Sequence, residues 1–584
     1  MKTAGTLLHG VAAAAGVGFG PAREIARDPV PAARRVASAD VAAEIALLRD
    51  AARSASMELR TMARAVRADG HADEAAIFVA HAAIAADPAI IDGAVAEIQA
   101  RGVDAATAIV AATSAAAAQI EGLSDELLRA RAADVRDVGD RIARTLVGVV
   151  EAELLPEPAV IVGEDLAPSL AATLPRERLL GIALEGSSAT AHAAILARAY
   201  GIPAVVGVAG LLAAVRAAGP AVHVAIDGSS GEVIVDPDPV SRDRFRDRMA
   251  SAESARRRDV DDAGLAPETL DGLAITLLAN IGTPAEAGTA AALGARGVGL
   301  FRTEFLFLER PSPPSEDEQV DAYRQAVEAF GGNPVTIRLL DVGGDKPIPY
   351  LALPPEDNPF LGVRALRLAG DRPELFLTQL RAAYRAAASG PVKVMAPMVA
   401  DASDVATLLE LVAEARVGLD HDSVPRGEIS IGVMVEIPSA VLAADSFLGE
   451  VAFASLGTND LLQYTIAADR GNAALRRYHD PLHPALLRLV RLSVEAADRA
   501  GIELSVCGEM AGDPIAALAL VGLGVRQLSM TPSSLGPVRR AIRSADASVL
   551  ERLALAALTD ASAEGVRARF AAVAVSADSA RRGS

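Results

Sequence analysis

Two patterns of apolar and polar positions divide the first part of the chain. Between about Asp40 and about Val150, apolar residues recur at spacings of three and four with charged residues between them, which predicts one amphipathic helix after another. From Ala159 the apolar residues instead form short runs separated by turns, which predicts strands. The runs are AVIVG, RLLGIAL, IPAVVGV, AVHVAID and EVIVDP, and residues 5–20 have the same character. We therefore expect an α/β domain made of residues 1–35 and 150–240, with a helical bundle inserted at residues 36–149.

A charged segment separates this α/β region from the rest of the chain. The sequence SRDRFRDRMASAESARRRDVDDAG has few apolar residues, and it predicts a solvated linker helix over residues 241–267. From residue 268 to 584, eight apolar runs alternate with helix-length segments, and a ninth, weaker run is FLGVRAL. The eight runs are AITLLAN, GVGLF, VTIRLLD, VKVMAPM, EISIGVMVEI, VAFASLG, IELSVCG and RQLSM. This alternation predicts a (β/α)8 barrel of the TIM type rather than an open doubly wound sheet.

Composition narrows the classes of partner and the cellular location. The chain has 584 residues, a formal net charge of -19, 3% aromatic residues and no Trp. The negative charge and the scarcity of aromatic side chains argue against nucleic acid, and they favour a small basic protein or an anion complexed with a metal ion as partner. A single cysteine cannot form an internal disulfide, and the eight histidines show no Cys/His spacing of the kind that binds zinc. We therefore expect a reducing, cytoplasmic location.

The N-terminal segment has two interpretations. Lys2 precedes an apolar, alanine-rich stretch, as in a short secretory signal. His9 and several glycines interrupt that stretch, so a first β-strand followed by a turn is favoured. No run of 18 or more uncharged apolar residues follows anywhere in the sequence, and we expect no insertion into a membrane.

Polar residues stand at the carboxyl ends of several predicted barrel strands. In a TIM barrel these ends surround one pocket, so the side chains are expected to face a common site. They are Arg302, Arg338, Asp341 to Lys346, Arg364, Glu436, Asn459, Asp460, Arg470 and Cys507. Arginines that converge with carboxylates are costly to bury unless a ligand completes the arrangement, although each residue by itself can also close a barrel end through a salt bridge.

These residue types indicate an anionic ligand that binds together with a metal ion. One arginine side chain grips two oxygens, so several arginines suit an anion that carries both phosphate and carboxylate. Glu436 and Asp460 can hold Mg²⁺, which prefers one or two carboxylates together with substrate oxygens and water. Cys507 has two interpretations that remain open: a small buried apolar residue, or a thiol that protonates a carbanion or enolate carbon.

One histidine outside the predicted barrel has an unusual context. His192 lies in LEGSSATAHAAILARAYGIPAVVGV, after a turn of small residues and at the first turn of an alanine-rich predicted helix. The free N–H groups and the dipole of such a helix favour an anion near the imidazole, and a neutral imidazole nitrogen is a competent nucleophile toward phosphorus. His81 and His479 are expected to have structural roles only.

Taken together, these segments resemble one family. The opening GVAAAAGVGFGPA, the segment RAADVRDVGDRIAR, the His192 segment and a set of barrel motifs are similar to enzyme I of the bacterial phosphoenolpyruvate-dependent sugar phosphotransferase system, the phosphoenolpyruvate-protein phosphotransferases. The barrel motifs are GLFRTEFLF, DVGGDK, NPFLGVR, VMVEIP, SLGTNDLLQYTIAADRGN and CGEMAGD. The resemblance covers nearly the whole chain.

The resemblance implies a phosphoryl relay between proteins. His192 would take phosphate from phosphoenolpyruvate and pass it to a histidine of the small phosphocarrier protein HPr, which would dock on the helical block. Glu436 and Asp460 would hold Mg²⁺, and Cys507 would protonate the pyruvate enolate. The residues assigned to phosphoenolpyruvate binding are Arg302, Arg338, Asn459, Asp460, Arg470 and Arg364. The barrel would form a homodimer, and the charged linker would be the hinge on which the His192 domain moves.

The loop around His192 departs from the family pattern, and two alternative functions remain open. The family usually reads GG-x-TSH, whereas this chain has SSATAH at residues 187–192; the missing glycines stiffen the turn, and Ala191 removes a hydroxyl. One alternative is a relative of pyruvate phosphate dikinase or phosphoenolpyruvate synthase, which would need an additional ATP-binding domain. The other is a non-catalytic regulatory paralogue that binds HPr or phosphoenolpyruvate without turnover.

Overall fold

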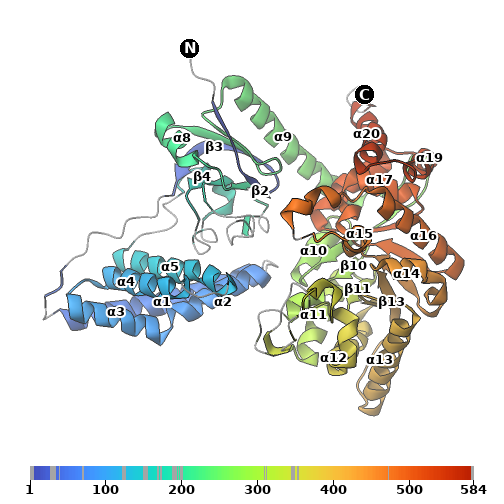
Figure 1. Cartoon of the computed structure of the whole chain (residues 1–584), viewed down its shortest axis with the longest axis horizontal. Helices are drawn as coiled ribbons and strands as arrows, with labels where there is room; N and C mark the ends of the chain where they lie inside the picture. The colour runs from blue at the N-terminus through green and yellow to red at the C-terminus, as the bar shows by residue number, and fades with distance from the viewer. Residues whose placement is uncertain are drawn as a thin grey trace. The chain divides into compact units, whose positions relative to one another are not determined.

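The computed structural model of the chain forms two compact units, Met1–Ser254 and Ala255–Ser584, which are described separately. Both are drawn in Figure 1. The residues that the structure describes are 5–25, 35–37, 40–68, 72–121, 126–148, 155–166, 170, 174–186, 194, 196–197, 201–307, 310, 312–343, 349–351, 354, 356–470 and 472–580.

The first unit contains an eight-stranded sheet built from the apolar runs at both ends of this part of the sequence. Its order is β1-β8-β7-β3-β4-β5-β6-β2. The strands are β1 (Thr6–His9), β2 (Val11–Ala14), β3 (Val17–Glu24), β4 (Ala159–Gly163), β5 (Leu179–Leu184), β6 (Ala204–Val206), β7 (His223–Asp227) and β8 (Glu232–Val235). Strand β3 pairs in parallel with β4 and antiparallel with β7, so it lies in the middle of the sheet, whereas β1 and β2 form its two edges. Helix α8 (Leu211–Ala218) packs beside β4 and β8.

The chain leaves this sheet after β3 and returns to it at β4, and five helices lie between. They are α1 (Val41–Ala68), α2 (Ala72–Ala85), α3 (Pro88–Arg101), α4 (Ala105–Glu121) and α5 (Glu126–Val147). Leu59, Phe78 and Ile98 are fully buried between them, as expected when apolar residues recur at helical spacing. His81 is also fully buried, with Nε2 3.3 Å from Asp134 and Nδ1 3.4 Å from Asp137.

The charged segment after β8 forms helix α9 (Pro239–Asp261). Among the residues of α9, only Phe245 is buried, which agrees with the solvated helix that the sequence predicts. The boundary between the two compact units falls inside this helix, after Ser254.

The second unit is a closed barrel of eight parallel strands. The strands are β9 (Thr276–Ile281), β10 (Val298–Phe301), β11 (Val335–Arg338), β12 (Val392–Ala396), β13 (Ile429–Val435), β14 (Phe453–Leu456), β15 (Glu503–Val506) and β16 (Gln527–Met530). Each pairs with its neighbour, and β16 pairs with β9, which closes the barrel. All eight strongly predicted strands are present. The apolar runs predict them because strands covered on both faces carry few polar residues.

Helices surround this barrel on the outside. They are α10 (Ala285–Ala292), α11 (Glu316–Ala329), α12 (Pro373–Ala386), α13 (Ala402–His421), α14 (Pro438–Leu442), α15 (Thr458–Ile466), α16 (Pro484–Ala500), α17 (Pro514–Gly522), α18 (Leu535–Arg543), α19 (Ala547–Ala557) and α20 (Ala563–Ala580). Figure 1 shows them around the strands of the second unit. The multidomain α/β fold with a C-terminal TIM-type barrel is therefore confirmed.

The ninth predicted strand, FLGVRAL, is wrong. Two 3₁₀ turns, Pro359–Leu361 and Ala365–Gly370, occupy this segment instead. Pro359 has no N–H group for a strand ladder, and Ala365 has a φ of 54°, which no strand residue adopts. The apolar side chains of this segment, such as Leu366 and Leu368, are buried by helical turns beside the barrel and not by a strand.

A helix that crosses a membrane needs about 20 predominantly apolar residues. Within the described residues no single helix is long and apolar enough to cross a membrane, and one bent pair, Ile77–Ala85 with Pro88–Arg101, passes by length and composition alone.

Candidate functional site

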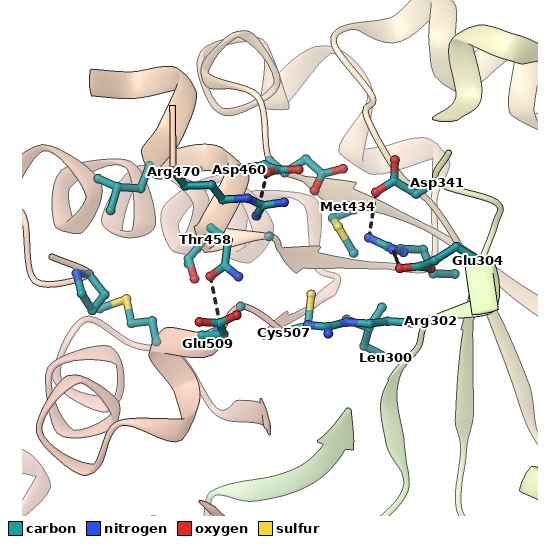
Figure 2. A pocket seen from close by; sticks show the side chains of 18 of the residues that line it. Leu300, Arg302, Glu304, Asp341, Met434, Thr458, Asp460, Arg470, Cys507 and Glu509 are labelled. Atoms are coloured by element: carbon teal, nitrogen blue, oxygen red, sulfur yellow. Dashed lines mark hydrogen bonds and ion pairs between the residues drawn. The ribbon is translucent and has the colours of Figure 1, made fainter. Parts of the chain in front are cut away.

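A cavity of about 510 Å³ lies at the carboxyl ends of the barrel strands. Eight residues that the sequence predicts at the carboxyl ends of the barrel strands line it: Arg302, Arg338, Arg364, Glu436, Asn459, Asp460, Arg470 and Cys507. Figure 2 shows the side chains that line it, from several different strand ends. Residues far apart in the sequence therefore meet at one site, as the closed barrel requires.

Arg338 is the last residue of β11 and is held by two carboxylates. Its Nη2 donates to Oε1 of Glu304 at 2.8 Å, and its Nη1 lies 3.0 Å from Oδ2 of Asp341. All three side chains are buried. Burial by itself would lower the pKa of Arg338, but Glu304 and Asp341 outweigh it and raise that pKa above its ordinary value. The guanidinium is therefore a fixed positive charge at the base of the cavity.

Arg364 joins three groups of the cavity wall. Its Nη2 lies 2.9 Å from Oδ1 of Asp341 and 3.3 Å from Oδ2 of Asp460, and its Nη1 donates to the Tyr464 hydroxyl at 3.2 Å. Tyr464 in turn donates to the Phe360 carbonyl at 2.8 Å, and burial is the main reason why its pKa rises to about 12. Arg364 thus has its charge largely matched before any ligand binds, which suits a residue that organises the site.

Two other arginines have more free hydrogen-bonding capacity. Arg470 is 39% exposed at its side chain and makes an ion pair of 3.1 Å with Oδ1 of Asp460. Arg302 lines the cavity directly after β10, and it forms no ion pair with any other residue that the structure describes. Guanidinium groups of this kind can still donate to the oxygens of an incoming anion.

Glu436 is a buried carboxylate in an unfavourable electrostatic position. One of its oxygens, Oε1, accepts from the backbone N–H of Met398 at 2.7 Å. Met398 has a φ of 59°, a left-handed conformation that is strained for this residue and that brings the N–H within reach of the carboxylate. Burial, together with Asp460 and Asp341, raises the pKa of Glu436 to about 8, against the opposing effect of Arg338. A cation at this point would remove the penalty.

The two carboxylates Glu436 and Asp460 fit a Mg²⁺ ion. Mg²⁺ is usually bound by one or two carboxylates together with substrate oxygens and waters. Within the described part of the chain no group of three or more His, Cys, Asp or Glu side chains is arranged to hold a metal ion, so an all-protein cage is absent there. Glu436 and Asp460 could supply two ligands, with the remaining positions open to the oxygens of an anion and to waters.

Close packing behind the carboxylates depends on glycine. A Cβ atom at Gly457 would lie 2.8 Å from both Cβ and Oε2 of Glu436. Gly457 immediately precedes helix α15, which carries Asn459 and Asp460 in its first turn. The turn thus brings two adjacent strand ends, those of β13 and β14, into direct contact.

Cys507 follows β15 directly and is 3% exposed. It belongs to an apolar cluster inside the barrel with Met395, Met434 and Phe453, and it also lines the cavity. Burial raises the pKa of the thiol to about 11, so it stays protonated at neutral pH. The apolar packing fits the first interpretation, a small buried residue, and the second interpretation needs a protonated thiol at the cavity, which the raised pKa supplies.

Asn459 is fixed by the loop that follows Cys507. Its Oδ1 accepts from the backbone N–H of Glu509 at 3.1 Å. This contact joins the first turn of α15 to the segment CGEMAGD.

Some residues of the site were not singled out from the sequence. They are Glu304, Tyr464 and Thr458, which line or support the cavity. Asp341, which the sequence did single out, proves to be the carboxylate that joins Arg338 and Arg364. The only signal for Glu304 was an acidic residue just after a buried strand. His192, and residues 344–348 with Lys346, lie outside the described residues.

Comparison with known proteins gives matches along almost the whole chain. Three family models match: "PEP-utilising enzyme, N-terminal" at residues 9–131, "PEP-utilising enzyme, mobile domain" at residues 155–231 and "PEP-utilising enzyme, PEP-binding domain" at residues 256–547. The last of these contains the barrel and every cavity residue named above.

Individual relatives match over nearly their full length. The chain is 40% identical over 539 residues to a protein from Bacillus sp. (strain S) and to one from Geobacillus stearothermophilus, in each case over 92% of this chain and 93% of the relative. It is 36% identical over 568 residues to one from Staphylococcus aureus, over 96% of this chain and 98% of the relative. All three relatives bear the same name, "Phosphoenolpyruvate-protein phosphotransferase".

Proposed function

The chain belongs to the family of phosphoenolpyruvate-protein phosphotransferases, enzyme I of the sugar phosphotransferase system, and from this premise we propose which residues perform the reaction. His192 takes the phosphoryl group from phosphoenolpyruvate bound in the barrel cavity and passes it to a histidine of HPr. The observation that carries the proposal is the convergence of four arginines with Glu436, Asp460 and Cys507 around one cavity.

The arginines bind and neutralise the substrate. Arg302 and Arg470, which have donors to spare, take phosphate and carboxylate oxygens, with Asn459 and Asp460 beside them. Arg338 and Arg364 are held by buried carboxylates, so their guanidinium groups stay at fixed positions and move little when the substrate binds. Phosphoryl transfer demands mainly alignment and neutralisation of oxygen charge, and preorganised guanidinium groups supply both.

Glu436 and Asp460 would hold Mg²⁺. When bound, the ion would neutralise phosphate oxygens and orient the substrate. On the protein side, the Met398 N–H keeps the Glu436 carboxylate in place, and Arg364 and Arg470 do so for Asp460.

Cys507 supplies the proton that completes the reaction. As the P–O bond of phosphoenolpyruvate breaks and an N–P bond forms at His192, the pyruvate enolate is left behind. The thiol gives its proton to the enolate methylene carbon, a C–H bond forms, and pyruvate and a thiolate remain; the thiolate then regains a proton from solvent. The raised pKa of Cys507 favours this role because the thiol is protonated before the step.

The partners and the division into domains belong to the same proposal. HPr docks on the helical block of residues 36–149, within the domain formed by residues 1–35 and 150–240. The barrel of residues 268–584 forms a homodimer, and the linker of residues 241–267 is the hinge for the movement that carries His192 between phosphoenolpyruvate and HPr. We place the protein in the cytoplasm, where phosphoenolpyruvate is available.

Transfer to HPr tests this function. The protein is incubated with labelled phosphoenolpyruvate, Mg²⁺ and purified HPr, and label is followed on both proteins. We expect label to reach HPr with the wild-type chain and to be absent from HPr with His192→Ala. Binding of phosphoenolpyruvate without any labelled protein would instead support a regulatory paralogue.

A further inference from the structure

A buried polar pair lies beneath the proposed proton donor. Asn280, near the end of β9, donates from Nδ2 to the backbone carbonyl of Cys507 at 2.9 Å. Ser529, on the neighbouring strand β16, donates from Oγ to Oδ1 of Asn280 at 2.6 Å. Asn280 is 6% exposed and Ser529 is fully buried. The two side chains thus form a hydrogen-bonded chain that ends at the peptide group of Cys507.

The Asn280–Ser529 pair supplies a hydrogen bond where the pairing between strands β15 and β16 has ended. Strand β15 ends at Val506, so the Cys507 carbonyl lies beyond the β15–β16 ladder, whose last pair is Val506 with Leu528. A buried carbonyl without a partner costs about 1–3 kcal/mol, and the Asn280 amide supplies that partner. The N–H group of Cys507 is held from the other side by the Leu456 carbonyl at 3.1 Å. Both backbone polar groups of Cys507 are therefore fixed, and its thiol donates to the same Leu456 carbonyl at 3.6 Å.

A glycine on strand β10 leaves space for the Ser529 side chain. A Cβ atom at Gly299 on β10 would lie 2.4 Å from the Ser529 hydroxyl oxygen, so only glycine leaves room for this side chain. Amides and hydroxyls are costly to bury in an apolar core, and apolar residues of similar size would fill the same space. The pair is therefore better explained by its hydrogen bond to the Cys507 carbonyl than by core packing.

We propose that Asn280 and Ser529 are positioning residues for the proton-donor step. They fix the peptide group of Cys507, and through it the direction in which the thiol delivers its proton to the enolate carbon. The inference rests on the proposed function, in which the S–H bond of Cys507 breaks as a C–H bond of pyruvate forms. Catalytic groups displaced by about 1 Å lose up to about a hundredfold in rate, so loss of either positioning residue affects turnover without any contact with substrate.

Kinetics of two variants and a matched control test the inference. Asn280→Leu removes the amide at similar volume, and Ser529→Ala removes the hydroxyl that orients it. Ser493→Ala is the control, since Ser493 is an equally buried hydroxyl of the same unit that donates only to the Leu489 carbonyl of its own helix. We expect kcat for pyruvate formation from phosphoenolpyruvate, with HPr present as acceptor, to fall about 10- to 100-fold in Asn280→Leu, and less in Ser529→Ala, with KM within twofold of wild type. Ser493→Ala keeps the wild-type kcat.

A double substitution shows whether Asn280 acts through Cys507. In a Cys507→Ala background, Asn280→Leu should cause no further loss, because the group that it positions is absent. The same fold loss in both backgrounds would overturn the inference and leave a merely structural role. If Cys507→Ala itself kept the wild-type kcat, the proposed proton donor would be wrong, which is a separate result from any effect of Asn280.

A direct readout of the thiol covers the case in which Cys507→Ala has no measurable turnover. Cys507 is the only cysteine of the chain, so alkylation by iodoacetamide reports on it alone. We expect the alkylation rate to rise several-fold in Asn280→Leu and to stay unchanged in Ser493→Ala. An alkylation rate and a kcat that both stay within twofold of wild type in Asn280→Leu would overturn the inference.

Discussion

At the scale of single residues, two arginines of the cavity differ in their surroundings, and this difference predicts different effects of substitution. Arg338→Ala leaves Glu304 and Asp341 buried with less compensating charge, so the free energy of unfolding should fall by about 3–5 kcal/mol. Arg470 is 39% exposed, and Arg470→Ala should change stability by less than about 1 kcal/mol. Both should lower kcat/KM for phosphoenolpyruvate by about 100-fold or more. Urea unfolding measures the loss of stability, and initial labelling rates measure the loss of kcat/KM. Equal losses of stability in the two variants would contradict the predicted difference between Arg338 and Arg470.

Cys507 provides a second prediction at this scale. Its pKa of about 11 lies above the ordinary 9.0, because the folded protein keeps the thiol in apolar surroundings. The folded state therefore holds the proton more tightly than the unfolded chain. The stability from this group is fully present below pH 9 and is lost as the pH rises toward 11. The rate of alkylation against pH should have its midpoint near 11 in the folded protein; a midpoint at 9 or below would contradict it.

Single residues also show how far sequence reasoning reaches. Arg302, Glu436 and Cys507 could be predicted because each is a polar residue directly after an apolar strand. Asn280 was missed because a buried polar residue that partners another strand has no marker in its own neighbourhood, and Glu304 was missed although it closely follows an apolar strand. Their partners, Arg338 and Cys507, are distant in sequence and meet them only when the barrel closes.

At the scale of elements, the turn between β14 and α15 packs directly against Glu436, one of the two proposed Mg²⁺ ligands. Gly457→Ala would place a methyl group 2.8 Å from Glu436, and such overpacking costs about 1–3 kcal/mol or displaces the carboxylate. We expect weaker Mg²⁺-dependent labelling and a smaller stabilisation by Mg²⁺ with phosphoenolpyruvate in a thermal unfolding assay. Gly449→Ala is the control, because a Cβ atom there meets no atom within 4 Å. Equal behaviour of the two variants would show that the turn does not set the carboxylate position.

Elements also show where pattern reading fails. The eight barrel strands follow from apolar runs, because both faces of each strand are covered. FLGVRAL has the same apolar content, but Pro359 and the left-handed backbone of Ala365 turn it into 3₁₀ segments. This segment contributes two hydrogen bonds to the cavity wall. The Phe360 carbonyl accepts from the Tyr464 hydroxyl, and the Arg364 guanidinium donates to Asp341. Apolar content alone does not reveal such a segment, whereas its proline and its polar contacts do.

At the scale of the whole molecule, the sequence predicts the fold class because the period of the apolar pattern changes twice along the chain. Apolar residues at helical spacing predict the inserted helical bundle, and short apolar runs predict the strands of the sheet and of the barrel. The strand order of the first sheet could not be predicted, since β1 and β2 pair with β8 and β6, and no local signal specifies those partners. The proposed acceptor His192 falls in the range of one compact unit and the barrel cavity in the other, so the proposed reaction needs both units.

The central claim is that the barrel cavity loads phosphate onto His192, and the position of the label tests it most directly. The protein is labelled with [³²P]phosphoenolpyruvate and Mg²⁺ in a single turnover and digested, and the labelled peptide is identified. We predict an acid-labile, base-stable label on the peptide that contains His192, strongly reduced in Arg338→Ala and absent in His192→Ala. Label on another residue, or undiminished label in His192→Ala, would contradict the account.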